Sequence, residues 1–409
     1  MRILLSEGAS TSAREAITAL GLRGHHVEVC DPDSHCLGRF SRFVRKFHRC
    51  PPLGTDPHGY FAFIMDRISG GKFDVLLPIH EQGLLFAKAH EAIARHVAVA
   101  LPPFESYVRA HNKLGFSQIL SELDLPQPAT RVVANATELM AAKRLPMVLK
   151  LPVGTASRGI WIVNDDAGFK RAVAEIEAID GFGESLVVQD VVHGDHQQCQ
   201  AVFADGRLLA SHAYRQIARG AGGGTSIKES VNHPIVRAHL GRIGEYLHWH
   251  GALSLDYIVN PASGTPYYFD CNPRLVEPMS AVFAGLDLVD VLLRVSRGET
   301  TAAVADSQSG VRTHIALQAL LGCAAREGSR LSVLRECGQL FAKRGPYAAS
   351  REELTPVAID WMSFVPPAVT ALWLLATPSA AHTLPKKGWG AQLLTPQSIR
   401  AIKIMDVGR

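Results

Sequence analysis

The sequence has no long apolar run, no cysteine framework and no strong charge of one sign, and each absence excludes a class of protein. The apolar stretch VTALWLLA (369–376) is far shorter than the roughly 20 residues of a membrane-spanning helix. Seven cysteines lie scattered without a repeated CxxC spacing, which favours buried thiols in a reducing compartment. A formal net charge of +4 over 409 residues gives no general affinity for nucleic acid. We therefore expect a soluble, cytoplasmic protein that binds neither membranes nor nucleic acids.

The opening residues are not expected to form a signal peptide, and the dinucleotide-binding fingerprint is also missing from the first βα turn. The opening residues MRILLSEG contain one basic residue and a short apolar run, which indicates a first strand. The segments RILLSEG, TSAREAITALGLRGH and HVEVCDP predict strand, helix and strand, hence a parallel sheet covered by helices. The first βα turn reads SEGASTSA instead of G-x-G-x-x-G, so a dinucleotide site is not expected there.

The rest of the N-terminal part is expected to add strands at 73–81 and 98–103, where two prolines mark a boundary. Residues 39–49, RFSRFVRKFHR, are interpreted as a helix with a basic face and an aromatic face. A basic patch for membranes or nucleic acid is the alternative there, and a solvated face is favoured.

The middle of the chain alternates strands with glycine-containing turns. HNKLGFSQILSELD predicts a helix, and residues 147–163 predict two strands around a turn. A strand is expected at 185–195, a hairpin around Asp205–Gly206, and a flexible loop at 218–230. A second hairpin turns at NPASGTP, and the last hundred residues look mostly helical.

Polar side chains end the second strand of that last hairpin, in the stretch YYFDCNPRL (267–275). Asp270 and Asn272 share one strand face, and antiparallel pairing can bring Asp256 beside them. Two carboxylates and an amide oxygen are hard donors that suit Mg²⁺. Arg274 continues the same face, where it would grip a phosphate or a carboxylate. The alternative that stays open is a buried Asp–Arg pair, with Asn272 capping a turn.

Two lysines and one strand end suggest a nucleotide. Lys150 ends the apolar strand MVLK and precedes the turn GTASRG, whose backbone N–H groups can cradle phosphates. Lys113 lies in the first turn of its helix, where it can also meet a phosphate. Gln189 and Asp190 stand at a strand end, where backbone groups can read an adenine edge and an acid can hold ribose hydroxyls.

In this order, the helix with Lys113, the strand with Lys150, VVQDVVHGD, GGGTSIKES and DYIV…YYFDCNPR resemble the ATP-grasp superfamily. The resemblance is close to its carboxylate–amine ligase and carbamoyl-phosphate-synthetase-like type, and it covers about residues 1–300. The most specific element is an E-x-N-P-R ending, which reads DCNPR in this chain. The family usually has Glu where Asp270 stands, so either the metal shifts or only one ion is held tightly.

The resemblance implies an α/β fold, with α+β character in the ATP-binding part. A Rossmann-like pre-ATP-grasp domain would occupy 1–105, a two-subdomain ATP-grasp fold 106–305 with a lid at about 126–188, and a C-terminal extension 306–409. The implied residues are, for ATP, Lys113, Lys150, Ser157, Gly159, Gln189, Asp190, Val192 and Asp195; for Mg²⁺, Asp256, Asp270 and Asn272; for stabilising the transferred phosphoryl group, Arg274 and Arg215.

The resemblance also implies an activity. ATP and Mg²⁺ would activate a small carboxylic acid as an acyl-phosphate, and an amine would then form an amide and release ADP and phosphate. The partners would be small-molecule carboxylate and amine substrates, with a homodimer as a candidate assembly. Two alternatives remain: a carboxylase-like enzyme that forms carboxyphosphate, and a nucleotide-binding regulator without turnover.

Overall fold

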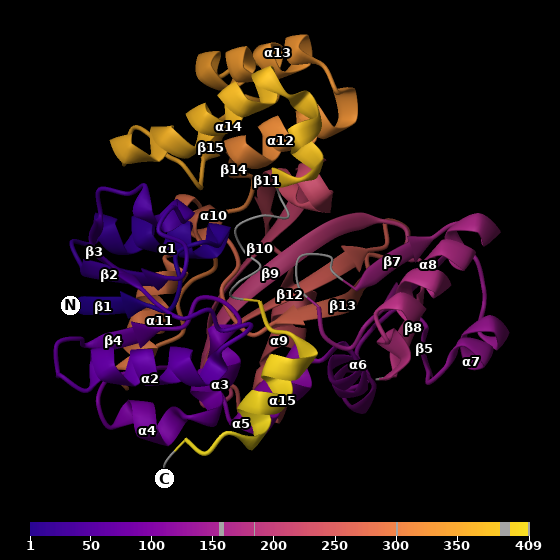
Figure 1. Cartoon of the computed structure of the whole chain (residues 1–409), viewed down its shortest axis with the longest axis horizontal. Coiled ribbons are helices and arrows are strands. Elements are labelled where there is room, and N and C mark those ends of the chain that lie inside the picture. The colour runs from indigo at the N-terminus through magenta and orange to yellow at the C-terminus, as the bar shows by residue number, and fades with distance from the viewer. Residues whose placement is uncertain (155–158, 184, 300–301, 385–392, 408–409) are drawn as a thin grey trace. The chain divides into compact units, whose positions relative to one another are not determined.

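A computed structural model describes residues 1–154, 159–183, 185–299, 302–384 and 393–407 (Figure 1). The chain divides into two compact units. Unit 1 comprises Met1–Phe104, Cys199–Ser254 and Pro273–Arg409, and unit 2 comprises Glu105–Gln198 and Leu255–Asn272. Strands β9 (Asp195–Ala204) and β12 (Gly251–Val259) contribute residues to both units.

The N-terminal part of unit 1 contains the predicted parallel sheet, whose strand order is β3-β2-β1-β4. Helix α1 follows β1 in the chain. It begins at Thr11 because the Ser10 side chain caps its first turn by accepting a hydrogen bond from the Ala13 N–H. Buried aliphatic side chains of β1, β2 and α1 form the core of this layer. The bounds are β1 Arg2–Leu5, α1 Thr11–Leu22, β2 His26–Asp31, β3 Val44–Arg49, α2 Pro57–Ile68, β4 Val75–Leu77, α3 Gln82–Lys88 and α4 His90–Ala94.

Two expectations for this layer are wrong. Residues 44–49 are strand β3 and not part of an amphipathic helix, because β3 pairs in parallel with β2. Tertiary pairing overrides the helical spacing of the basic residues there. At 98–103 the structure has only an isolated bridge from Ala98 to Val75 in place of a full strand.

Unit 1 also contains a run of paired strands in the order β9-β10-β11-β14-β15. The predicted hairpin turn at Asp205–Gly206 is confirmed, and both residues have the positive φ angles that such tight turns need. The expected flexible loop at 218–230 is wrong for most of its length, because β10 and β11 pair up to Arg219 and Thr225. Only 220–224 connect them. The bounds are β10 Arg207–Arg219, β11 Thr225–Val231, β14 Arg312–His314 and β15 Ser350–Glu352.

Further helices of unit 1 follow β11 along the chain. In the C-terminal part, α12, α13 and α14 share a small core that contains Leu320, Val333 and Leu374. Within the described ranges, no helix is both long and apolar enough to cross a membrane. The bounds are α9 Pro234–Tyr246, α10 Met279–Phe283, α11 Leu288–Ser296, α12 Ala316–Glu327, α13 Arg330–Ala342, α14 Val365–Ala376 and α15 Pro396–Ile404.

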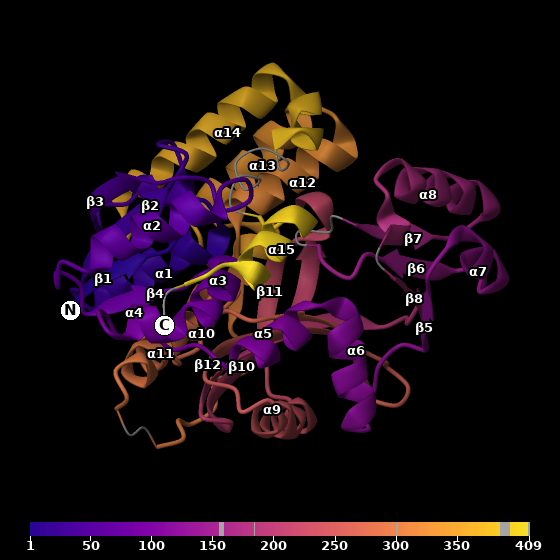
Figure 2. The ribbon, with the colours of Figure 1, turned by 60° about the horizontal axis from the view of Figure 1, so that its bottom comes forward.

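Unit 2 is built on a four-stranded antiparallel sheet in the order β5-β8-β6-β7, with α8 packed against it (Figure 2). Phe169 and Ile176 of α8 are buried with Met147 and Leu149 of β6. The predicted hairpin of β12 and β13 completes this unit. The bounds are α5 Phe104–His111, α6 Lys113–Glu122, β5 Thr130–Val133, α7 Ala136–Ala141, β6 Met147–Lys150, β7 Ile160–Val163, α8 Asp166–Ala178, β8 Leu186–Asp190 and β13 Pro266–Asn272.

Candidate functional site

Five of the predicted site residues converge inside unit 2. Lys113 is the first residue of α6, which begins there because the Asn112 side chain accepts hydrogen bonds from two backbone N–H groups of the first turn. The Lys113 side chain is only 4% exposed; its Nζ lies 3.3 Å from Asp270 Oδ1 and donates to the Gly154 carbonyl at 2.9 Å. One lysine thus connects the helix start, the β6–β7 turn and strand β13.

Lys150 is buried at the end of β6, as the position of the lysine in MVLK predicted. Its Nζ donates to the Phe269 carbonyl at 2.9 Å and lies 4.9 Å from the centre of the Phe269 ring. Burial lowers the pKa of Lys150 to about 8; the carboxylate of Asp270 counteracts this and the charge of Lys113 adds to it. An anion such as a phosphate would stabilise the charged form of this buried amine, so Lys150 is suited to bind one.

Asp256 and Asn272 lie side by side on the paired strands β12 and β13. Asn272 Nδ2 donates to Asp256 Oδ2 at 3.1 Å, and Gln198 Nε2 donates to Asp256 Oδ1 at 3.1 Å. His196 Nε2 lies 3.5 Å from the same Oδ1. The pairing that the sequence predicted for the hairpin therefore places these two side chains together.

The donor set fits a magnesium ion. Among the described residues no cluster of three or more His, Cys, Asp or Glu side chains could hold a metal ion by itself. Asp256, Asp270 and Asn272 instead offer two carboxylates and one amide, all oxygen donors. Mg²⁺ is commonly held by one or two carboxylates, with water and phosphate oxygens as its other ligands. The two carboxylates are also partly exposed, at 16% and 24% of their side-chain surface.

The predicted adenine-contacting segment forms the end of β8 and the connection to β9. Gln189 is buried and donates to Thr130 Oγ1, whereas Asp190 accepts from Arg131 Nη2 at 2.6 Å. Val192 lies in the connection, and Asp195 is the first, exposed residue of β9. Asp190 is thus engaged by an arginine that sequence reasoning did not include.

The β6–β7 turn is only partly described. Ser157 lies outside the described residues. Gly159 has φ +70°, and its carbonyl accepts from the Leu151 N–H at 2.8 Å, which closes the base of the turn. This positive φ favours glycine, and a Cβ atom at Gly159 would lie 2.7 Å from Leu151 Cδ1, so the leucine side chain would have to move.

The two predicted arginines belong to unit 1. Arg274 Nη1 lies 3.4 Å from Ser12 Oγ, at the start of α1, and the Arg274 carbonyl accepts from Ser254 Oγ. Arg215 on β10 pairs with Glu229 on β11 at 2.7 Å, and Arg312 binds the second oxygen of that carboxylate. Glu229 therefore neutralises part of the charge that Arg215 would offer to a phosphate.

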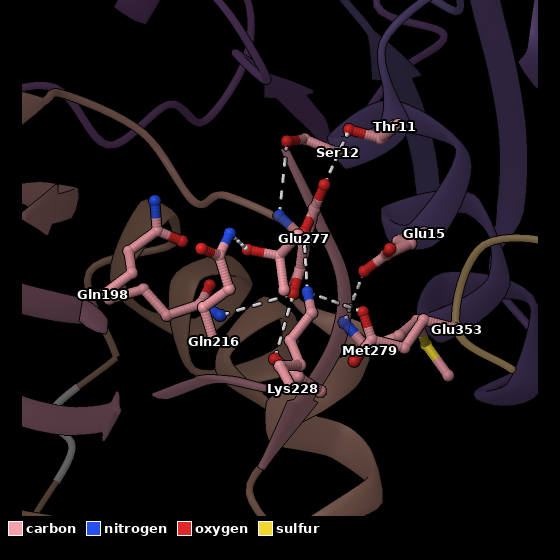
Figure 3. Close-up of polar contacts among 12 residues, drawn as sticks. Thr11, Ser12, Glu15, Gln198, Gln216, Lys228, Glu277, Met279 and Glu353 are labelled. Carbon is pink, nitrogen blue, oxygen red and sulfur yellow. Dashed lines mark hydrogen bonds and ion pairs between the residues drawn. The ribbon is translucent and has the colours of Figure 1, made fainter. Parts of the chain in front are cut away.

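Sequence reasoning missed a buried ionic cluster in unit 1. Figure 3 shows Glu277 between Thr11 and Ser12 on one side and Lys228 on the other. Lys228 Nζ lies 2.6 Å from Glu277 Oε2 and 2.7 Å from Glu353 Oε2. The sequence showed only Lys228 in GGGTSIKES and Glu277 three residues after Arg274. Neither residue lies in an apolar pattern that would predict its burial.

Comparison with solved structures identifies the fold. The L-amino acid ligase from Bacillus licheniformis matches with a TM-score of 0.61 and 17% identity, over 77% of this chain and 80% of that chain. The N5-carboxyaminoimidazole synthetase from Staphylococcus aureus, complexed with ADP, matches with a TM-score of 0.60 and 11% identity, over 78% and 84%. The chain has the ATP-grasp fold.

A third ATP-grasp structure shows the same extent of similarity. It is the biotin carboxylase domain dimer of the Hydrogenobacter thermophilus 2-oxoglutarate carboxylase, in complex with MgADP, ADP and bicarbonate. It matches with a TM-score of 0.60 and 15% identity, over 76% of this chain and 73% of that chain. No protein-family model matches the sequence. The comparisons therefore confirm the predicted α/β fold, with its N-terminal parallel sheet and its antiparallel sheets, and the resemblance on which it was based.

Proposed function

We propose that this protein is an ADP-forming enzyme that uses ATP and Mg²⁺ to activate a carboxylate. The observation that supports this proposal is the convergence in unit 2 of Lys113 and Lys150 with Asp256, Asp270 and Asn272. Two buried ammonium groups beside two carboxylates and an amide combine phosphate-binding and magnesium-binding chemistry in one place. The ATP-grasp relatives support it further, since solved structures among them contain ADP or MgADP.

The finer proposal is that the activated acid is joined to an amine. A carboxylate is a poor electrophile, because its oxygen is a poor leaving group. Transfer of the γ-phosphoryl group of ATP to the carboxylate gives an acyl-phosphate and ADP. The amine then attacks the carbonyl carbon, a proton leaves the nitrogen, and phosphate departs, so that an amide bond is formed. The protein has to position the reactants, neutralise charge and exclude water.

The residues are assigned as follows. Lys113 and Lys150 contact the ATP phosphates, and Ser157 and Gly159 are further ATP-binding residues. Residues 189–192 line the adenine, with Asp190 or Asp195 at the ribose. Arg274 and Arg215 stabilise the transferred phosphoryl group. Asp256, Asp270 and Asn272 hold Mg²⁺, which when bound neutralises phosphate charge.

The domain boundaries 1–105, 106–305 and 306–409, the lid at about 126–188 and a homodimeric assembly are likewise proposals.

The second candidate function is carboxylation through carboxyphosphate. It is favoured by the match to the biotin carboxylase domain in complex with bicarbonate and to the N5-carboxyaminoimidazole synthetase, at TM-scores close to that of the amino acid ligase. Bicarbonate would then take the place of the organic acid as the phosphoryl acceptor. The third candidate is a nucleotide-binding regulator without turnover. It is favoured by Asp270, which stands where the family usually has Glu and could therefore hold the metal ion less well.

One screen tests all three functions. ADP release is measured with Mg·ATP and panels of organic acids and amines, added singly and in pairs, and separately with bicarbonate, with mass detection of the products. ADP release that requires an acid, with a new amide in the mixture, supports the ligase. Release that requires bicarbonate supports the carboxylase, and ATP binding without stimulated turnover supports the regulator. The Lys150→Ala variant, run in parallel, should lose any turnover that belongs to this site.

A further inference from the structure

A fully buried lysine, Lys228, connects the C-terminal part of the chain to Glu277, which lies three residues after Arg274. Lys228 on β11 has no exposed side-chain surface and lies between two carboxylates, 2.6 Å from Glu277 Oε2 and 2.7 Å from Glu353 Oε2 (Figure 3). The phenol ring of Tyr214 covers its ammonium at 4.5 Å. Removing a single partner from such a buried ion pair leaves an uncompensated charge, so each carboxylate constrains where Lys228 can lie.

Glu277 is held in an unusual backbone conformation at the other end of this contact. Its φ is +53°, in the left-handed region that non-glycine residues rarely adopt. The Glu277 N–H donates to Ser12 Oγ at 3.3 Å, and Thr11 Oγ1 donates to Glu277 Oε1 at 3.4 Å. Arg274 Nη1 contacts the same Ser12 Oγ at 3.4 Å. Strained residues persist only where their surroundings fix them, and here Lys228 and the start of α1 do so.

The cluster carries more carboxylates than cations. Glu15 of α1 is also fully buried; its Oε2 accepts from the Met279 N–H, and its charge acts on Lys228 and Glu353. Burial raises the pKa of Glu15 well above its usual range and that of Glu353 to about 7. Glu277 is the one carboxylate of the three with exposed surface, 13% of its side chain.

We propose that Glu353 is a positioning residue, which acts through Lys228 and Glu277 to hold Arg274 in its working orientation. This inference rests on the proposed function, because that assigns Arg274 to the transferred phosphoryl group. The chain of contacts runs from Glu353, after β15, to Lys228 on β11, then to Glu277, and through the shared Ser12 hydroxyl to Arg274. All five residues of this chain of contacts belong to unit 1, so the C-terminal segment constrains Arg274 from within its own unit.

A second buried ion pair supplies a matched control. Arg14 of α1 and Asp360 are both without exposed side-chain surface, with Nη2 and Oδ2 2.9 Å apart. This pair also connects the C-terminal segment to α1, and its side chains further contact Thr18, Ser41 and the Arg42 N–H. It shares the burial and the charge type of the Glu353 contact, and none of its hydrogen-bond partners is Lys228, Glu277 or Ser12. A stabilising role alone would make the two pairs equivalent.

The experiment compares Glu353→Gln with Asp360→Asn in the full chain, once a stimulating acid is known. Glu353→Gln should lower kcat for ADP release roughly ten- to hundred-fold, as expected for a misplaced catalytic group, while KM for ATP stays within about two-fold. Asp360→Asn should lower the melting temperature with kcat largely kept. Glu353→Asp, which restores the charge, should recover part of the lost kcat. If Glu353→Gln does not fold, Glu353→Asp replaces it in the comparison with Asp360→Asn. Equal kcat losses in both variants, in proportion to lost stability, would overturn the proposal.

A second measurement does not depend on turnover. A buried ammonium exchanges its protons slowly, so ¹⁵N-lysine NMR should show a protected Nζ resonance that disappears in Lys228→Met and shifts in Glu353→Gln but not in Asp360→Asn. If that resonance does not respond to Glu353→Gln, the chain of contacts is wrong whatever the enzyme does. If the resonance responds while neither an organic acid nor bicarbonate stimulates ADP release, the proposed function fails. The Glu353–Lys228 contact is then confirmed, but the positioning role is wrong because Arg274 has no catalytic role.

Discussion

Lys113 Nζ lies 3.3 Å from Asp270 Oδ1, so a buried cation already neighbours the carboxylate that is proposed to bind magnesium. The pair connects the first residue of α6 to strand β13, within unit 2. Asp270 therefore has a structural contact as well as a proposed catalytic one. The same lysine also donates to the Gly154 carbonyl, so it keeps a partner when the carboxylate changes.

Asp270→Asn should abolish acid-dependent ADP release, because the amide keeps the size and one oxygen but removes the charge. The fold should survive at a cost of roughly 1.5–3 kcal/mol, the usual range for a hydrogen bond to a charged group. An ADP-release assay checks the loss of activity. Thermal melts with and without Mg·ATP check the fold and nucleotide binding, and the nucleotide should no longer raise the melting temperature.

Asp270→Glu is the companion variant, since it restores the residue that the ATP-grasp family usually has. It should retain measurable activity if the metal shifts by about a bond length. An inactive Asp270→Glu beside an active Asp270→Asn would contradict the metal assignment, because the charge would then not matter.

Lys150→Ala should weaken ATP binding at least ten-fold, in line with roughly 1.5–3 kcal/mol for a hydrogen bond to a charged group. The pKa of Lys150 is lowered to about 8, so the free protein loses this charge as the pH rises through 8. Wild-type affinity for ATP should therefore fall between pH 7 and pH 9.5, whereas the alanine variant should bind weakly throughout. Calorimetry across this range checks it, with Lys143→Ala, a lysine paired with Asp166 in the same unit, as the control.

Glu7 should make the fold less stable as the pH rises. Burial raises the pKa of Glu7 from 4.5 to about 7. Because the folded state binds this proton more tightly than the unfolded state, the contribution is complete below pH 4.5 and is lost as the pH rises through 7. The shift corresponds to about 3 kcal/mol at most.

Urea unfolding at pH 5.5 and pH 8 measures this effect of Glu7. Glu7→Gln should gain stability over wild type at pH 8 relative to pH 5.5, because the amide needs no proton. Glu91→Gln, at an exposed position, should show no such difference. A parallel response of both variants would mean that the Glu7 carboxyl is not the group responsible.

ATP should bind more tightly than GTP in the presence of Mg²⁺, because backbone groups of 189–192 are proposed to read the adenine edge. The Asp190 N–H already donates to the Ala129 carbonyl, which leaves this reading to the residues that follow β8. Competition calorimetry with both nucleotides checks the placement, and equal affinities would refute it.

Local patterns in the sequence were enough to predict much of unit 2. The alternation along YYFDCNPRL put Asp270 and Asn272 on one strand face, and the turn NPASGTP implied the pairing that brings Asp256 to Asn272. The apolar strand MVLK ended in a lysine that is buried as expected for a site. These features are local, because side-chain direction follows from strand periodicity and hairpin pairing follows from a nearby turn.

Only the tertiary structure decided the rest. The basic residues at 44–49 have helical spacing, yet they form β3 because β2 offers a partner strand. The glycines at 220–224 suggested a long loop, yet β10 and β11 pair almost up to them. Lys228 and Glu353 look like surface charges in the sequence, and both are buried because each neutralises the other from a distant part of the chain. Whether a charge can be buried depends on its partners in space, which no local pattern specifies.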